Sequence, residues 1–451
     1  MPAPRERPLP GPKGRHLIGS LMDVRRDRLK FVTQVTQQYG DLICFRMGWK
    51  NLYLLNHPDH ARHILCDNVS NYRKGLGLAE ARPLLGNGLL TSDGDLWASQ
   101  RRLLQAAFQN KYHEEFCTLM GEATLLSLER WQDRARSGDA VDVAREMVIL
   151  TITILGFTLF RADLSERAIA LSNDLTLLSR WAMSRMTSLV RLPIGVPSRK
   201  NYLARQALKR LESHVEQMIR EHDSRCDRHR EDLISLLASD CEENGVAHNK
   251  QMRDEIMTLL LAGHETTAAT LSWTWYLLSQ HPEVERRVQA EVDELVAGRI
   301  PTLSDLQKLV YTKMVIYEVL RLYPPVWLLP RKAINDDFLD QHRIPANSDV
   351  LLCVYTLHRH AGYWRDAERF DPERFATEEC AQRVSNVYLP FGAGPRTCIG
   401  SRFGLIEVLL VVALIAQRFS WRLCAGQKVE TEASLTLRPR HGLQMTLHSR
   451  V

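Results

Sequence analysis

The sequence lacks the features that mark a secreted protein. Its nine cysteines are scattered without paired spacing, and no secretory signal precedes them. The disulfide frameworks of secreted domains need a patterned set of cysteines and an oxidising compartment. We therefore expect free thiols in a reducing compartment, and a cytoplasmic protein.

Long apolar runs are missing as well. The two longest, Met147–Phe160 and Phe403–Phe419, fall short of the about 20 residues that a membrane-spanning helix needs, and Glu407 interrupts the second. The first residues, Met1–Gly14, are rich in proline, arginine and lysine where an anchor helix would be apolar. We expect both runs to form core helices, and we expect no membrane anchor.

A strong excess of one charge is also absent. The chain has 59 basic and 53 acidic residues, a net charge of +6, and no basic tract interleaved with aromatic residues. Nucleic-acid-binding proteins usually carry such a tract, so this class is excluded, whereas a local basic face for an acidic protein is not. No repeat or clear linker divides the sequence. We expect a single domain over residues 1–451, with a Pro-rich lead-in over residues 1–15 and no fused reductase.

The pattern of apolar residues predicts a mostly α fold with a minor β region. Leu42–Leu55 has the pattern of two strands joined by a glycine turn. Helical periodicity dominates from His57 onward, interrupted by a glycine- and leucine-rich loop over Gly75–Gly88. Near the end, Ser434–Leu437 and Leu443–Leu447 predict a hairpin. We expect one small sheet drawn from both ends of the chain.

The densest chemical signal is the stretch from Phe391 to Gly400, where Cys398 lies in a glycine-rich loop two residues after Arg396. The apolar run that follows predicts a buried helix, so the loop would present a thiolate at a helix N-terminus. Backbone N–H groups and the helix dipole favour negative charge there. A sulfur held in this way suits a metal better than a disulfide. The alternative is an ordinary glycine-rich turn leading to a buried core cysteine.

A second signal lies in the long helix predicted over Arg253–Ser279. One face of this helix has glycine and threonine in mid-helix, where both are poor helix formers, so we expect the face to make room for a ligand or water. Glu265 beside Thr266 adds an ionisable group next to a hydroxyl, and the two could relay protons into an apolar pocket. A capping or surface pair is the alternative. The residues of this face are Leu259, Gly263, Thr266 and Thr270.

A third signal is a charged pair on the helix predicted over Tyr311–Leu322. Glu318 and Arg321 are three residues apart and therefore share a face of that helix. Arg374 follows later in an Asp-Pro-Glu-Arg-Phe segment. An exposed pair of this kind is common and contributes only a few tenths of a kcal/mol.

These motifs occur in the order of the cytochrome P450 family, which the chain resembles over nearly its whole length. The Cys398 loop resembles the family's haem-binding pattern, Phe-x-x-Gly-x-Arg-x-Cys-x-Gly, at every fixed position. The stretch around Glu265 and Thr266 resembles the family's oxygen-activating helix. The resemblance implies the cytochrome P450 fold, in which a long central helix lies over haem and the cysteine loop lies on the opposite face.

The resemblance also implies the cofactor and the roles of the residues around it. The cofactor would be haem b (iron protoporphyrin IX), with Cys398 as the metal ligand. Thr266 would hydrogen-bond dioxygen and a delivery water, and Glu265 would supply protons. The other residues that would bind the cofactor are Trp97, Arg101, Arg331 and Arg396. The residues that would form a buried network are Glu318, Arg321 and Arg374. The residues that would line the substrate pocket are Leu76, Leu78, Leu259, Gly263, Val326, Trp327, Leu328, Leu329 and Leu435.

The implied activity is that of a monooxygenase that inserts one oxygen atom from O2 into a lipophilic substrate. A fatty acid, terpenoid, steroid or polyketide would suit an apolar pocket. Near the pocket mouth, Arg73, Lys74 and Arg82 could meet a carboxylate or remain exposed. A separate ferredoxin or flavodoxin with its reductase would supply electrons, and the cations that could meet it are Arg101, Arg102, Lys111 and Arg402. A haem-thiolate peroxygenase or isomerase, and a non-catalytic haem-binding protein, remain as alternatives.

Overall fold

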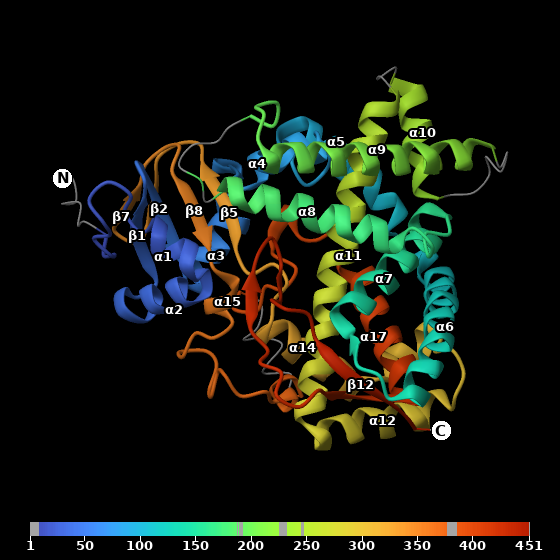
Figure 1. The fold of residues 1–451 in the computed structure, drawn as a ribbon. Coiled ribbons are helices and arrows are strands. Elements are labelled where there is room, and N and C mark those ends of the chain that lie inside the picture. Colours follow the sequence, from blue (N-terminus) through green and yellow to red (C-terminus); the bar gives the residue numbers. More distant parts are fainter. Residues whose placement is uncertain are drawn as a thin grey trace.

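The computed structural model describes residues 9–186, 188, 193–224, 232–244, 248–376 and 386–450, so the first eight residues of the expected lead-in lie outside it. Helices dominate, and most strands gather at one end of the molecule (Figure 1). This confirms the mostly α fold with a minor β region. The helices are α1 (Leu21–Arg26), α2 (Arg28–Tyr39), α3 (Pro58–Arg62), α4 (Leu78–Leu85), α5 (Gly94–Ala107), α6 (His113–Ser137), α7 (Val143–Leu155), α8 (Ala168–Met186), α9 (Arg199–Ser224), α10 (Leu233–Asn244), α11 (His248–Gln280), α12 (Pro282–Val296), α13 (Leu303–Lys308), α14 (Val310–Leu322), α15 (Val354–Leu357) and α17 (Ser401–Arg418).

The largest sheet has five strands in the order β1-β2-β8-β5-β3. Its β2–β8 pair is parallel and its other pairs are antiparallel. The predicted hairpin over Leu42–Leu55 is confirmed, and its turn contains Gly48 at φ +61°. The strands are β1 (Leu42–Met47), β2 (Lys50–Leu55), β3 (Tyr72–Lys74), β4 (Val141–Asp142), β5 (Leu329–Ala333), β6 (Asp337–Leu339), β7 (His342–Ile344), β8 (Asp349–Leu352), β9 (Phe419–Leu423), β10 (Thr431–Ala433), β11 (Leu437–Pro439) and β12 (Gln444–Ser449).

Three expectations about the strands and loops are wrong. The main sheet is completed by β5 and β8 rather than by the end of the chain. At that end β10 pairs with β11, while β12 pairs with β9 and β4, so the predicted hairpin has the wrong partners. The predicted loop over Gly75–Gly88 contains the helix α4. Alternating apolar residues indicate a strand but do not identify the strand it pairs with.

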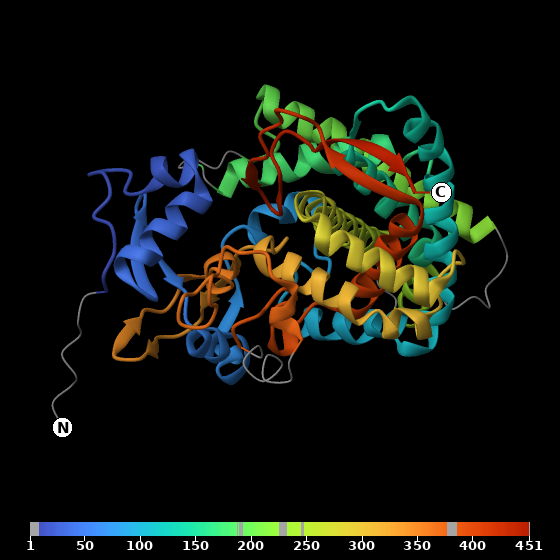
Figure 2. The same cartoon turned by 90° about the horizontal axis from the view of Figure 1, so that it is seen from below.

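Helix α11 passes through the middle of the molecule, and it contacts α7, α14 and α17 (Figure 1). Seen from below, strand β9 lies along one side of α11 (Figure 2). Because α11 is surrounded in this way, nearly every residue of its central part is buried. The accessible residues that remain on it therefore mark where it faces something other than the core.

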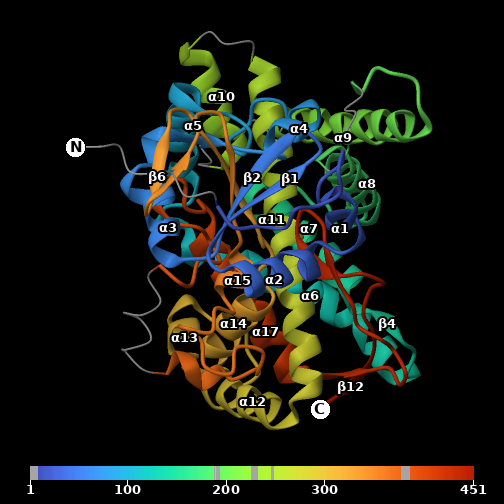
Figure 3. The same ribbon diagram turned by 90° about the vertical axis from the view of Figure 1, so that its left-hand side faces the viewer.

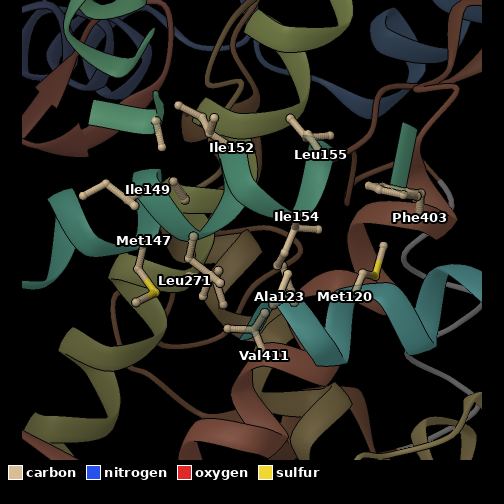
Figure 4. Close-up of a cluster of buried hydrophobic side chains, with 14 of the residues drawn as sticks. Met120, Ala123, Met147, Ile149, Ile152, Ile154, Leu155, Leu271, Phe403 and Val411 are labelled. Carbon is tan, nitrogen blue, oxygen red and sulfur yellow. The ribbon is translucent and has the colours of Figure 1, made fainter. Parts of the chain in front are cut away.

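The main hydrophobic core joins α6, α7, α11 and α17. Figure 4 shows side chains from these helices meeting, among them Met120, Met147, Leu155, Leu271 and Val411. The run Val143–Phe160, which is α7 with the π-helical turn that follows it, is long and apolar enough to cross a membrane, but 72% of it is buried inside the protein. Both long apolar runs therefore form core helices, as their lengths predict.

Candidate active site

The cysteine loop is fixed by backbone contacts that only glycine permits. The Cys398 N–H donates to the Phe391 carbonyl at 2.9 Å. Gly394 has φ +70°, and a Cβ at this position would lie 1.9 Å from the Leu65 carbonyl oxygen. A side chain there would therefore push the loop away from Leu65, so the glycine positions the loop. Helix α17 starts three residues after Cys398.

The Cys398 thiol lies where its charge can be stabilised. The side chain keeps accessible surface, although protein surrounds it on most sides and this burial raises the pKa of the thiol. A thiol at the bottom of a recess has both properties, since it is accessible from one side and enclosed by protein on the others. The Gly400 N–H and the Arg101 guanidinium act in the opposite direction and lower that pKa. Arg101 is held beside the loop because its Nη1 donates to the Thr397 carbonyl at 2.8 Å.

A cluster of buried and half-buried basic side chains adjoins the loop. The Arg396 guanidinium lies over the Trp97 ring at 5.2 Å from its centroid, and its Nη1 is 2.7 Å from Asp93 Oδ1. Arg331 is buried with Nε unpartnered, and burial, followed by the charge of Arg396, lowers its pKa to about 10. Lys74 stands opposite Arg331 in the β3–β5 register. The cluster therefore concentrates positive charge around the Asp93 carboxylate.

Lys74 is a site residue that our sequence reasoning did not assign to this cluster. Its Nζ donates to the Leu89 carbonyl at 2.5 Å. Burial, which Asp93 opposes and the nearby Arg396 and Arg331 charges reinforce, lowers the pKa of Lys74 to about 7. The side chain is half-buried rather than at an open pocket mouth. Only the β3–β5 pairing, which the sequence does not reveal, brings it to Arg331.

Helix α11 carries its acid and its alcohol on different sides. The Thr266 hydroxyl donates to the Ala262 carbonyl at 2.8 Å, and Ala262 is exposed between the partly accessible Leu261 and Gly263. Glu265 is buried and points toward α8 and the β10–β11 turn. It accepts hydrogen bonds from Thr436 at 2.7 Å and Ser179 at 3.3 Å. The accessible face of the helix is therefore centred on Ala262 and Thr266.

The other residues expected on that face lie along the same side of the continuous helix α11, but they are less accessible than Thr266. Leu259 and Thr270 are buried. A Cβ at Gly263 would lie 2.9 Å from Leu155 Cδ2, so this glycine allows α7 to pack closely against α11. The expected room for a ligand at Gly263 is thus largely taken by Leu155.

Arg438 joins Glu265 to a second carboxylate. Its Nη1 lies 3.7 Å from Glu265 Oε1, and its Nε donates to Glu432 at 3.0 Å. No motif marks Arg438, because it is separated from Glu265 by most of the C-terminal half of the chain. Like Thr436 and Ser179, it was missed by sequence reasoning.

The structure brings Glu318, Arg321 and Arg374 together. Glu318 and Arg321 are fully buried, and Arg321 donates to both carboxylate oxygens, at 2.6 and 2.7 Å. Arg374 Nε lies 3.3 Å from Glu318 Oε1, and the Asp371 N–H donates to the same oxygen at 2.9 Å. Arg321 also donates to the carbonyls of His358 and Ala367. The pair thus ties α14 to the segment preceding the cysteine loop.

The nine residues expected to line the substrate pocket divide into two groups. Leu259 and Trp327 are buried, and the Trp327 indole donates to the Ser434 carbonyl at 2.9 Å, so both belong to the core. The rest keep accessible surface: Leu76, Leu78, Gly263, Val326, Leu328, Leu329 and Leu435. Leu329 lies beside the cysteine loop, because its Cδ1 would be 4.0 Å from a Cβ at Gly392.

Comparison with known proteins decides the family. The family model described as Cytochrome P450 matches residues 9–447. The chain belongs to the cytochrome P450 family. Among similar proteins, cyclooctatin synthase of Streptomyces melanosporofaciens is 35% identical, with 94% of this chain and 92% of the relative covered. Cyclooctat-9-en-7-ol 5-monooxygenase of the same organism is also 35% identical (93% and 91% covered), and pentalenene oxygenase of Streptomyces avermitilis is 32% identical (90% and 89%).

As a cytochrome P450 monooxygenase, this protein uses haem iron, O2, an organic substrate and a redox partner. The donor set at the site fits an iron porphyrin. The accessible Cys398 thiol offers a soft ligand, and a metal deprotonates a coordinating thiol outright. Buried cations with an unpartnered Arg331 Nε fit the carboxylates of such a cofactor.

Proposed function

We propose that this cytochrome P450 is a single-domain, cytoplasmic enzyme that carries haem b and oxygenates a terpenoid-type substrate. The observation that carries the proposal is the accessible Cys398 thiol at the N-terminus of α17, flanked by Arg101. When bound, haem supplies the activation of O2 for insertion of one oxygen atom into a C–H or C=C bond, which a thiolate ligand promotes.

Five residues besides Cys398 would hold the cofactor. Trp97 orders Arg396 by stacking, and Arg101 stays close to the loop through the Thr397 carbonyl. Arg331 and Lys74 are paired across two strands, so their positions depend on the sheet rather than on flexible side chains. Lys74 joins the family positions Trp97, Arg101, Arg331 and Arg396 because strand pairing places it opposite Arg331, where two carboxylates of the cofactor need partners.

Proton supply would fall to α11. The Thr266 hydroxyl donates its hydrogen bond to the Ala262 carbonyl. Its oxygen can therefore still accept a hydrogen bond from a water or from another donor on the accessible face. Glu265 is the adjacent residue and holds an ionisable group near that face, while Thr436, Ser179 and Arg438 fix its orientation. A buried carboxylate next to a hydroxyl suits proton transfer into an apolar pocket.

The substrate class follows from two supports. The partly accessible residues expected to line the pocket are apolar, which favours an apolar substrate recognised by shape. Two relatives are named for oxygenation of pentalenene and of cyclooctat-9-en-7-ol, an unsaturated hydrocarbon and an alkenol. A terpenoid-type hydrocarbon or alkenol agrees with both the apolar lining of the pocket and the substrates for which these relatives are named.

The electron donor would be an acidic ferredoxin or flavodoxin with its reductase. Arg102, Lys111 and Arg402 are exposed on α5, on the short turn before α6 and at the start of α17. Arg402 is held by a hydrogen bond of 2.9 Å to Asn110, and Arg101 is held beside the cysteine loop by the Thr397 carbonyl. Such a cluster steers an acidic partner toward the cysteine side.

The cofactor assignment is tested by the absorption spectrum of the reduced protein with carbon monoxide. We expect the strongly red-shifted Soret band of a thiolate-ligated haem in wild type and in Cys424→Ser, a control at a half-buried cysteine elsewhere. Cys398→His should lose that band while retaining haem. A red-shifted band in Cys398→His, or its absence from freshly prepared wild type, would refute the ligand.

The proton route is tested by Thr266→Ala. Without the hydroxyl we expect consumption of the electron donor to continue, while at least half of the electrons appear as peroxide rather than product. Thr274→Ala is the control, since this threonine makes the same bond to the preceding turn but is fully buried. Unchanged product yield in Thr266→Ala would show that the hydroxyl is not in the route.

A further inference from the structure

The segment Gly86–Leu90 follows α4, and its backbone is fastened to α11 by two neighbouring acids. The Asn87 N–H donates to Asp254 Oδ2 at 2.8 Å, and the Leu89 N–H donates to Glu255 Oε2 at 2.9 Å. Both acids are buried. Figure 3 shows α4 beside α11, so the segment reaches this helix without a long connection.

Glycine allows the segment to approach α11 closely. A Cβ at Gly86 would overlap the Asp254 carboxylate, and a Cβ at Gly88 would overlap Thr258 Oγ1. Gly86 also has φ +61°, where a side chain would be strained. Thr258 precedes Ala262 by about one helical turn, so the segment covers α11 directly before the accessible face of that helix.

The backbone of Leu89 connects Glu255 to Lys74. Its N–H donates to Glu255, while its carbonyl accepts from Lys74 Nζ at 2.5 Å. The Lys74 N–H donates to Asp93 Oδ1 at 3.3 Å, and the same oxygen lies 2.7 Å from Arg396 Nη1. A continuous series of polar contacts therefore runs from α11 to the cluster of basic side chains beside the cysteine loop.

The charges of Glu255 and Lys74 also influence each other. Burial raises the pKa of Glu255 to about 7, and the Lys74 charge opposes that rise. Burial lowers the pKa of Lys74 to about 7, and the charges of Asp93 and Glu255 oppose that fall. Glu255 and Lys74 therefore stabilise each other's charged form, although a backbone residue lies between them.

We propose that Glu255 is a positioning residue of the cofactor site, which acts through the backbone of Leu89 to hold the Lys74 ammonium in the cluster of basic side chains. The inference rests on the proposed function, in which Lys74 meets a carboxylate of the cofactor. Without the Glu255 acceptor, the Leu89 N–H would be left unpaired against a buried part of α11, which costs more free energy than the hydrogen bond itself contributes. The segment Gly86–Leu90 would then move off α11 and carry the carbonyl partner of Lys74 away.

Resonance Raman spectroscopy of the ferric holoenzyme tests this role, because the bending bands of the haem propionates shift with the hydrogen bonds that these carboxylates accept. Lys74→Met should shift one of these bands, and Glu255→Ala should shift the same band in the same direction. Glu255→Gln keeps an oxygen that can accept from the Leu89 N–H, so its spectrum should stay close to that of wild type.

Glu291→Ala is the matched control. Glu291 also accepts a hydrogen bond from a distant backbone group, the Tyr311 N–H at 2.7 Å, but it lies on α12 and binds the start of α14. Its removal should leave the propionate bands unchanged.

A double-mutant cycle separates the positioning role from a clasp that only stabilises the segment. If Glu255 acts through Lys74, Glu255→Ala should produce no further shift in the Lys74→Met background. A further shift as large as that in wild type would overturn the proposal. So would an unshifted band in Glu255→Ala when Lys74→Met shifts it, and this outcome leaves the role of Lys74 intact. An unshifted band in Lys74→Met would instead remove Lys74 from the cofactor site, and the inference with it.

The coupling is reciprocal, so it can also be measured without changing Glu255. Lys74→Met removes the partner of the Leu89 carbonyl, and amide hydrogen exchange over Gly86–Thr91 in the holoenzyme should become at least roughly threefold faster. Exchange around Tyr311 should stay as in wild type. Equal exchange over Gly86–Thr91 in the two proteins would overturn the proposal even if Glu255→Ala does not fold.

Discussion

The Arg438 guanidinium lies between two carboxylates, those of Glu432 and of the buried Glu265 on α11. Glu432 lines a groove at the surface and accepts a hydrogen bond from Arg438 Nε, while Glu265 lies near Nη1 of the same guanidinium. A cation in this position holds the two carboxylates on either side of one guanidinium and fixes their orientation. It is a positioning residue, since it acts on the proton route through Glu265.

Removal of that cation gives a residue-level prediction. Arg438→Gln should reduce the yield of product per electron consumed by roughly two- to tenfold, because Glu265 loses the group that orients it. Arg438→Lys should restore part of the yield. The control is Arg440→Gln, which breaks an exposed pair with Glu430 two residues further on. A loss of yield in Arg440→Gln equal to that in Arg438→Gln would contradict a specific role.

Glu407 gives a second prediction, on the dependence of stability on pH. It is fully buried in α17, and neither carboxylate oxygen has a hydrogen-bond partner among the described residues. Burial raises the pKa of Glu407 well above its usual value, and the nearby Thr267 hydroxyl acts in the opposite direction. Its contribution to stability is therefore complete below the unfolded pKa of about 4.3 and is lost as pH rises toward the folded pKa.

Glu407→Gln removes this titration. The variant should gain stability relative to wild type between pH 5 and pH 8, by up to about 1.4 kcal/mol per pH unit, and the gain should be smallest at pH 5. Thermal unfolding of both proteins across this pH range measures it. A constant difference at every pH would mean that Glu407 stays ionised in the folded protein.

At the scale of elements, the Glu318 carboxylate joins α14 to the segment that leads to the cysteine loop. Glu318→Ala leaves Arg321 and Arg374 without their acid in a buried site, a change that costs about 3–5 kcal/mol. We expect protein that expresses poorly and loses haem. Glu368→Ala is the matched control, because Glu368 pairs with Arg359 at the surface and its removal should change stability by less than about 1 kcal/mol. A stable, haem-loaded Glu318→Ala protein would contradict the role of the network.

Sequence patterns predicted these elements where the information is local. The buried helix after Cys398, the charged pair at Glu318 and Arg321 and the first hairpin each depend on residues close together in the chain. Contacts between distant segments were not predicted, since periodicity does not identify partners. Lys74 meets Arg331 through strand pairing, and Arg438 meets Glu265 through a turn that the sequence placed in the wrong hairpin.

At the scale of the whole molecule, charge is divided between two faces built from different elements. One carries Arg102, Lys111 and Arg402 near the cysteine loop, and the other carries Arg25 of α1, Arg180 of α8 and Lys200 of α9 around one groove. A net charge of +6 spread evenly would not select any partner or orientation. Two separate clusters allow two different partners to be distinguished by where they approach.

Charge reversal at Arg102 tests the first face. Arg102→Glu should raise the KM for an acidic ferredoxin by roughly three- to tenfold at low salt, and the difference should shrink as salt screens the charges. Arg136→Glu, at an exposed position at the end of α6, should leave the KM unchanged. Equal effects of the two variants would mean that net charge, rather than this face, governs the encounter.

The pairing of Lys74 with Arg331 limits how the chain can change its length. Side chains alternate along a strand, so one residue inserted into β3 would turn Lys74 away from the cation cluster. Gly75 follows directly, and a Cβ there would lie 2.5 Å from the Arg331 backbone. Insertions and deletions between Tyr72 and Gly75 are therefore selected against, whereas the exposed loop Pro193–Pro197 is free to lengthen.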